Sequence, residues 1–202
     1  MTNRTDSRRR AALFIIDVQN DFTEGGILGV DGGAAVAAGV SRLLAEKADD
    51  YVAVFASRDW HDATGDNGGH FAGVDKAPDF VTTWPVHCVA GTPGAEYHPD
   101  LETSGVTVHV LKGQGRPAYS IFEGVTGDGL TVDEKLEELG VTDIDVVGIA
   151  TDYCVLASAS DALDTGRVVR VFRDLVAGVA SSSSEDALAT LADNGAVISN
   201  SR

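Results

Sequence analysis

Short apolar runs rich in β-branched residues alternate along the chain with segments of helical periodicity. The apolar runs predict strands at 12–18, 51–58, 106–113, 143–150, 168–172 and 196–199. The intervening periodic segments predict helices at about 33–48, 131–139, 153–165 and 183–193. Because a connection between parallel strands must carry a helix back over the sheet, this alternation favours a three-layer α/β/α domain.

Two segments do not follow this alternation. Residues 59–100 are rich in proline and glycine and have no sustained period, and a connection of this length in a small domain is typical of a functional loop. Residues 1–10 place arginines before apolar residues, as export signals do, but the apolar run stops at Asp17 and no small-residue cleavage site follows. We therefore expect a disordered or frayed tail over 1–10 and a single domain over 11–202.

Composition and charge narrow the possible partners. The 202 residues are 44% hydrophobic, which is typical of a globular protein, and carry a formal net charge of −16. The electrostatic field of this negative charge repels phosphate backbones and anionic lipid surfaces, so neither nucleic acid nor a membrane is an expected partner. No apolar stretch approaches the roughly 20 residues that span a bilayer. Two cysteines are too few for a disulfide scaffold in a chain of this length, and we expect a cytoplasmic protein.

Reactive side chains lie at or just beyond the ends of four of the predicted strands. Asp17 follows the run LFII in the first, Asp59 follows the second, Lys112 follows the run VHVL in the third, and Cys154 follows the fourth at the start of a predicted helix. Ligands of parallel α/β sheets bind beyond the carboxyl ends of the strands, so these residues are expected at one rim. A helix N-terminus and a nearby lysine both favour the thiolate form of a cysteine, and Asp17 is a candidate acceptor for the thiol proton.

The long loop also holds a candidate metal site. Its histidines and acidic residues include Asp59, His61, His70 and His87. One carboxylate with two or three imidazoles suits a single Zn²⁺, Fe²⁺ or Mn²⁺ ion with positions left open for water. The spacing of these residues is irregular, however, and does not by itself distinguish a metal site from ordinary polar loop residues.

Several motifs, in order, resemble the nicotinamidase/pyrazinamidase branch of the isochorismatase-like cysteine hydrolases. They run from Ala11 to about Val179 and include ALFIIDVQNDFTEGGILGVDGG, SRDWH, HFAG, TTWPVHCVAGTPGAEYHPDL, AYSIFEG and IDVVGIATDYCV. The resemblance implies the isochorismatase-like hydrolase fold, with a six-stranded parallel sheet of order 3-2-1-4-5-6. The first and fourth strands then meet at the point where the strand order reverses.

The resemblance also implies roles for individual residues. Asp17, Lys112 and Cys154 match the family's catalytic triad, and the backbone amides of Ala150 and Cys154 match its oxyanion hole, next to a cis peptide bond between Ile149 and Ala150. Asp59, His61 and His87 match its metal ligands, with His70 as a fourth ligand that only some members use. The walls of the substrate site correspond to Phe22, Trp84 and Tyr119.

Two positions depart from the family pattern. Many close relatives have histidine where this chain has Tyr153, immediately before the cysteine. The stretch DATGDNGG before His70 is also longer than in those relatives, which leaves the ligation by His70 open.

These features imply hydrolysis of nicotinamide to nicotinate and ammonia through a cysteine thioester, in NAD salvage, with pyrazinamide as a second substrate. The expected cofactor is one divalent ion (Zn, Fe or Mn), and the protein is expected to be a monomer or a homo-oligomer. One alternative is another amidohydrolase of the superfamily, of the N-carbamoyl or ureidoacrylate type, which generally lacks the metal motif. A second alternative is a metal-binding or scaffolding domain without activity.

Overall fold

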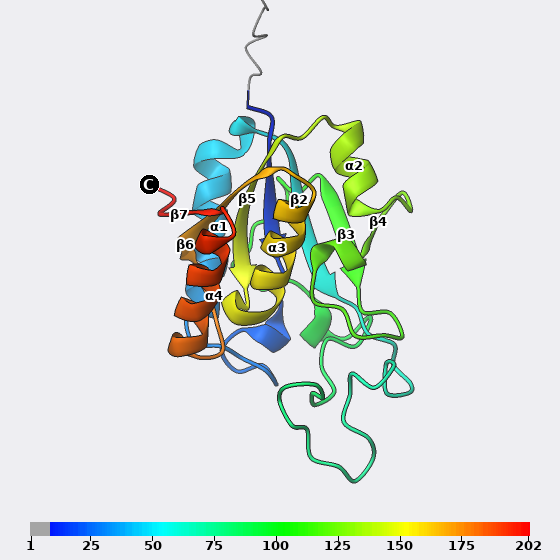
Figure 1. The fold of residues 1–202 in the computed structure, drawn as a ribbon. Helices are drawn as coiled ribbons and strands as arrows, with labels where there is room; N and C mark the ends of the chain where they lie inside the picture. Colours follow the sequence, from blue (N-terminus) through cyan, green and yellow to red (C-terminus); the bar gives the residue numbers. More distant parts are fainter. Residues whose placement is uncertain (1–8) are drawn as a thin grey trace, which may run out of the picture.

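A central, mostly parallel sheet separates two layers of helices in the computed structural model, which describes residues 9–202 (Figure 1). The strands are β1 (Ala11–Ile16), β2 (Tyr51–Asp59), β3 (Val108–Lys112), β4 (Val125–Thr126), β5 (Asp143–Ile149), β6 (Val168–Ala177) and β7 (Val197–Ser199). The helices are α1 (Gly33–Lys47), α2 (Val132–Glu138), α3 (Leu156–Asp164) and α4 (Ser181–Asp193).

The strand order in the sheet is β4-β3-β2-β1-β5-β6-β7. Six of these strands are parallel and, counted along the chain, have the predicted order 3-2-1-4-5-6. The prediction of six strands needs one correction, because the two-residue strand β4 adds an antiparallel edge to β3. Strands β1 and β5 lie side by side, so the order reverses between them, where this class of sheet binds its ligands.

The central strand β1 is buried on both faces, as its continuous apolar sequence requires. Leu13 and Ile15 pack into a core beneath α1, whereas Phe14 and Ile16 pack into a second core beneath α2, α3 and α4. The three-layer architecture thus follows from the alternation of side chains along a strand that is apolar throughout.

Several element boundaries differ from the prediction. Strand β6 continues to Ala177, five residues beyond the predicted end at 172. The helix predicted from 153 begins instead as a π-helical turn at Thr151–Val155, before α3. Helix α4 starts at Ser181 and takes no cap from its own N-cap residue, Ala180. A carboxylate from elsewhere in the chain, described below, instead binds the two residues before this helix.

Most of the predicted N-terminal tail, residues 1–8, lies outside the described residues. The last two residues of the predicted tail, Arg9 and Arg10, are described and make defined contacts. Arg9 pairs with the buried carboxylate of Asp145 at 2.7 Å, and Arg10 donates to the carbonyls of Leu139 and Gly140. Among residues 9–202, no helix has both the length and the hydropathy needed to cross a bilayer.

The connection from β2 to β3 extends beyond the carboxyl ends of the strands, as Figure 1 shows. Apart from one short helical turn at Pro93–Ala95, it has no regular element. It is held by hydrogen bonds and isolated bridges instead, among them His61 with Val89 and Phe71 with Trp84. The long loop predicted at 59–100 is therefore an ordered layer over the strand ends.

Replacing Phe14 by alanine should lower the free energy of unfolding by about 3–5 kcal/mol. Its ring is fully buried, and the ring centroids of Phe55 and Phe122 lie 5.3 and 5.8 Å away. Urea denaturation measures the loss, and Val168→Ala is the control because Val168 is 58% exposed. The control should change stability by less than about 0.5 kcal/mol, and equal losses in both variants would contradict this description of the core.

Candidate active site

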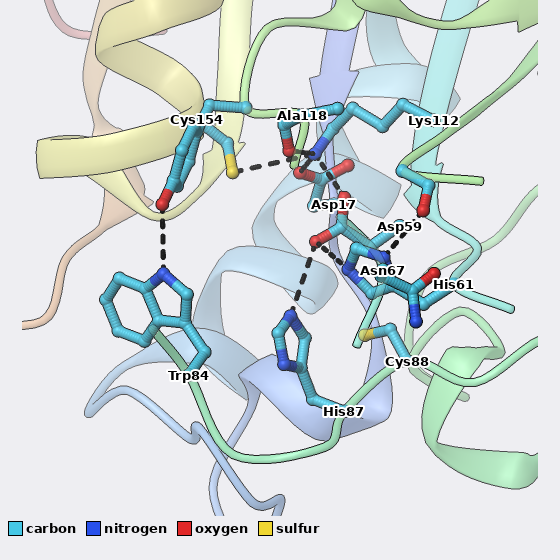
Figure 2. Close-up of polar contacts among 12 residues, drawn as sticks. Asp17, Asp59, His61, Asn67, Trp84, His87, Cys88, Lys112, Ala118 and Cys154 are labelled. Carbon is cyan, nitrogen blue, oxygen red and sulfur yellow. Dashed lines mark hydrogen bonds and ion pairs between the residues drawn. The ribbon is translucent and has the colours of Figure 1, made fainter. Parts of the chain in front are cut away.

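The carboxyl ends of four strands bring four reactive side chains together. Asp17 directly follows β1, Asp59 ends β2, Lys112 ends β3, and Cys154 lies in the turn after β5. All four are buried, with exposed fractions between 0% and 7%. We call Asp17, Asp59, Lys112 and Cys154 the lysine cluster (Figure 2).

The Lys112 ammonium contacts every other member of this cluster. It lies 2.8 Å from Asp17 Oδ2, pairs closely with Asp59 Oδ1, and lies 3.7 Å from the Sγ of Cys154. It also donates to the carbonyl of Ala118 at 3.2 Å (Figure 2). A buried ammonium needs such partners because an uncompensated charge in the interior costs several kcal/mol.

The two carboxylates of the cluster have opposite pKa shifts. Burial raises the pKa of Asp17 despite the opposing charge of Lys112. Burial acts in the same direction on Asp59, but there Lys112, His61 and His87 outweigh it and hold the pKa of Asp59 well below its usual value. A carboxylate with a raised pKa suits a general base, and one that stays ionised suits a metal ligand.

The thiol of Cys154 is held protonated in the resting site. Burial raises the pKa of Cys154 well above its usual value; Lys112 opposes this, and the charges of Asp17 and Asp59 reinforce it. The prediction that Cys154 favours the thiolate form is therefore wrong for the resting site, because full burial and two carboxylates act against the negative charge on sulfur. Deprotonation of Cys154 requires a base, and Asp17 is the carboxylate with the raised pKa beside it.

Asp59 also belongs to a second, adjacent group. We call Asp59, His61, His70 and His87 the histidine cluster. One ligand atom from each of these buried residues lies within 4.8 Å of every other. Oδ2 of Asp59 is 3.5 Å from His61 Nε2 and 3.7 Å from His87 Nε2. Burial, together with the neighbouring histidines, lowers the pKa of His70 to about 3, so its imidazole is neutral, as metal ligation requires.

Backbone carbonyls orient two of these imidazoles. His61 Nδ1 lies 2.8 Å from the carbonyl oxygen of Gly113, and His87 Nδ1 lies 2.7 Å from that of Pro85. A carbonyl only accepts hydrogen bonds, so Nδ1 of each ring donates and Nε2 faces the cluster. A Cβ atom at Gly113 would lie 2.6 Å from the His61 ring, so glycine is needed there.

The residues of the histidine cluster fit a divalent cation. Within residues 9–202, His61 Nε2 and His70 Nδ1 are buried without a hydrogen-bond partner. An unsatisfied buried polar atom costs about 1–3 kcal/mol, which ligation of a cation offsets. One carboxylate and three imidazoles match the ligands that Zn²⁺ and Fe²⁺ prefer.

Three polar residues that were not predicted from the sequence hold Asp17, Asp59 and the cysteine turn in place. Ser57 donates to Asp17 Oδ1 at 2.7 Å, and Gln19 pairs with both the amide and the carbonyl of Asp59, at 2.8 and 2.9 Å. Asp152 accepts hydrogen bonds from the amides of Val179 and Ala180 and from Ser183, which joins the cysteine turn to the start of α4. A polar residue within or next to an apolar strand is the only sequence signal that marks Ser57 and Gln19.

A cavity of about 400 Å³ opens onto both clusters. The predicted wall residues Phe22, Trp84 and Tyr119 all line it, as do Ala150 and Cys154 of the predicted oxyanion hole. The Ile149–Ala150 peptide bond is cis, as the resemblance implied. Tyr153 also lines the cavity, stacks on Tyr119 and meets Trp84 edge-on at 5.1 Å, so the residue that departs from the family pattern becomes part of an aromatic wall.

Comparison with known proteins identifies the family. The Isochorismatase domain matches residues 11–202. The chain belongs to the isochorismatase family. One relative in this family, a nicotinamidase/pyrazinamidase from Mycobacterium tuberculosis, is 50% identical over 177 residues, which cover 88% of this chain and 91% of the relative.

Solved structures of similar fold agree with this assignment. A nicotinamidase/pyrazinamidase from Acinetobacter baumanii superposes with a TM-score of 0.81 at 33% identity, covering 96% of this chain and 98% of the other. A pyrazinamidase from Pyrococcus horikoshii in complex with zinc gives a TM-score of 0.79 at 34% identity, covering 95% and 99%. The isochorismatase fold therefore extends over nearly the whole described chain.

Metal removal and replacement test the histidine cluster directly. Protein stripped with a chelator should bind a single Zn²⁺ ion per chain in a calorimetric titration. His87→Ala should weaken this binding by at least about tenfold, because it removes one of four buried ligand atoms. His109→Ala is the control, since His109 lies on an exposed face of β3 outside the cluster. Equal binding by His87→Ala and wild type would contradict the site.

Proposed function

We propose that this isochorismatase-family enzyme is a nicotinamidase, which hydrolyses nicotinamide to nicotinate and ammonia and also accepts pyrazinamide. The observation that carries the proposal is one cavity lined both by the buried thiol of Cys154, which Lys112 contacts, and by Asp59, His70 and His87 of the histidine cluster. The relatives named above as nicotinamidases and pyrazinamidases support the same reaction.

The first half of the reaction forms a thioester. Asp17 accepts the proton of Cys154, and Sγ attacks the carboxamide carbon as the carbon–oxygen double bond opens to an oxyanion. The amides of Ala150 and Cys154 donate to this oxyanion. Asp17 then returns its proton to the amide nitrogen, the carbon–nitrogen bond breaks, and ammonia leaves.

The second half releases the acid. A water molecule loses a proton to Asp17 and attacks the thioester carbon, again with the negative charge on the oxyanion held by the same amides. The carbon–sulfur bond breaks, Asp17 returns the proton to Cys154, and the acid leaves and gives its own proton to solvent as nicotinate. Lys112 stays charged throughout: burial opposes this, but Asp17 and Asp59 raise the pKa of Lys112 well above its usual value.

The aromatic walls and the histidine cluster position the ring of the substrate. Phe22, Trp84 and Tyr119 enclose the pyridine ring, and the hydrogen bond from Trp84 Nε1 to the Tyr119 hydroxyl, 2.9 Å, keeps two of these side chains in place. Asp59, His61, His70 and His87 would hold the ion, Zn²⁺, Fe²⁺ or Mn²⁺, which when bound supplies a Lewis acid for the ring nitrogen. Proton transfer and nucleophilic attack belong to the lysine cluster.

The remaining expectations form part of the same proposal. Residues 11–202 act as one catalytic domain, because both hydrophobic cores share a single sheet. Nicotinamide is the small-molecule partner, the reaction serves NAD salvage in the cytoplasm, and the active unit is a monomer or a homo-oligomer.

Ammonia release from candidate substrates tests the function. Metal-loaded protein should release ammonia from nicotinamide and pyrazinamide and should leave an N-carbamoyl amine and ureidoacrylate intact. An ion held by the histidine cluster can be coordinated by a pyridine or pyrazine nitrogen, which those two compounds lack. Turnover of either compound without turnover of nicotinamide would assign a different amidohydrolase activity.

Cys154→Ala should abolish this turnover without unfolding the chain, because it removes the nucleophile from a turn that tolerates alanine. Cys88→Ala is the matched control. Cys88 is also buried, but within residues 9–202 the one hydrogen bond of its Sγ goes to the Gly94 carbonyl, at 3.9 Å, and burial raises its pKa well above the usual value. The control should keep most of the wild-type kcat, and comparable losses in both variants would refute Cys154 as the nucleophile.

Asp17→Asn and Lys112→Ala should each lower kcat by several orders of magnitude, and the double variant should be little slower than either one. The residues contact each other at 2.8 Å and act on the same proton transfer, so their losses do not add. Steady-state kinetics measures the effect, with thermal melting to confirm that each variant is folded. Losses that multiply in the double variant would show that the two side chains work independently.

A further inference from the structure

The chain reaches His70 through a tight reversal built from three left-handed residues. Asn67, Gly68 and Gly69 have φ angles of 48°, 68° and 87°. Glycine adopts this region freely and asparagine tolerates it better than most residues, so the sequence NGG permits the reversal. The amide of His70 then donates to the carbonyl of Asn67 at 3.3 Å, which fixes the start of the His70 segment.

The side chain of Asn67 joins this reversal to two neighbouring segments of the chain. It is 3% exposed, and its Oδ1 accepts from the amide of Asp62 at 2.8 Å and from the amide of Gly115 at 3.2 Å. Its Nδ2 donates to the carbonyl of Asp62 at 3.1 Å. One buried side chain thus joins the residue after His61, the reversal itself and the turn after β3.

The turn after β3 is a shared support for two members of the histidine cluster. Its Gly113 carbonyl orients His61, and its Gly115 amide binds Asn67. The reversal packs directly on this turn, because a Cβ atom at Gly68 would lie 3.1 Å from the carbonyl oxygen of Gly115. The position of His70 relative to His61 is therefore set through Asn67.

We propose that Asn67 is a positioning residue that holds His70 as the fourth ligand of the metal centre. The proposal rests on the metal centre of the proposed function. It concerns ligation by His70, which the longer stretch before this residue leaves open in the sequence. Partners that orient metal ligands typically contribute about 10–100-fold to metal affinity. Loss of the Asn67 side chain should weaken Zn²⁺ binding by that factor.

The test is the affinity of chelator-stripped protein for Zn²⁺, measured by competition with a chromogenic chelator. Asn67→Gly removes all three side-chain hydrogen bonds and keeps a backbone that accepts positive φ. Asp75→Gly is the control, because Asp75 also has a positive φ, 66°, and its side chain is exposed and makes no hydrogen bond within residues 9–202. We expect a 10–100-fold loss for Asn67→Gly and less than about a twofold change for Asp75→Gly.

A double-mutant cycle with His70→Ala separates positioning from a general structural role. If Asn67 acts through His70, Asn67→Gly should cost little further affinity once His70 is absent. Thermal melting in excess chelator measures the stability of each metal-free variant. Unchanged affinity in Asn67→Gly, or the same loss with and without His70, would overturn the proposal. A wild-type protein that binds no divalent ion would overturn the metal centre as well.

Asn67→Asp gives a second, milder variant with an outcome of its own. It keeps the oxygen that accepts from Asp62 and Gly115, loses the hydrogen bond donated to the Asp62 carbonyl, and adds a negative charge near the centre. Positioning predicts weaker Zn²⁺ binding than in wild type, whereas a purely electrostatic influence of residue 67 predicts tighter binding. Tighter binding in this variant would therefore contradict the proposal even if Asn67→Gly does not fold.

Discussion

The buried ammonium of Lys112 is the constraint on which the arrangement of the site depends. It lies where β1, β2 and β3 end and contacts Asp17, Asp59 and the Cys154 sulfur. Without it, two buried carboxylates would share one site, and neither would stay ionised at low cost. Its attraction also separates their roles. Asp59, which the histidines face as well, has a pKa held far below its usual value, whereas that of Asp17 remains raised by burial.

Asp59 joins the two clusters into one site. Its Oδ1 pairs with Lys112, and its Oδ2 faces His61 and His87 at 3.5 and 3.7 Å. With Lys112 charged and both carboxylates ionised, the lysine cluster carries one net negative charge, which a divalent cation beside Asp59 would more than offset. The same charge balance favours a thiolate during turnover, so the metal centre and the nucleophile are coupled electrostatically through one carboxylate.

The sequence predicts best those features that depend on local pattern. The continuous apolar run of β1 and the helices between strands indicate a parallel three-layer fold, and motif resemblance supplies the strand order. Strand β4 is not predicted because two residues, Val125 and Thr126, are too few to show a periodicity, and they pair at the sheet edge. The supporting roles of Ser57, Gln19 and Asn67 are not predicted for another reason. Their roles exist only through partners such as Asp17, 40 residues from Ser57 along the chain, which no local spacing reveals.

The raised pKa of the thiol is consistent with catalysis because the proton transfer conserves charge within the buried site. When Cys154 gives its proton to Asp17, one negative charge moves from a carboxylate oxygen to sulfur, and the desolvated cluster gains no charge. Lys112 lies 2.8 Å from the first position and 3.7 Å from the second, so the same cation stabilises both states. A preorganised ammonium of this kind needs no reorganisation during the step. The burial that keeps the resting thiol protonated is therefore the same burial that strengthens the stabilisation of the thiolate once Asp17 holds the proton.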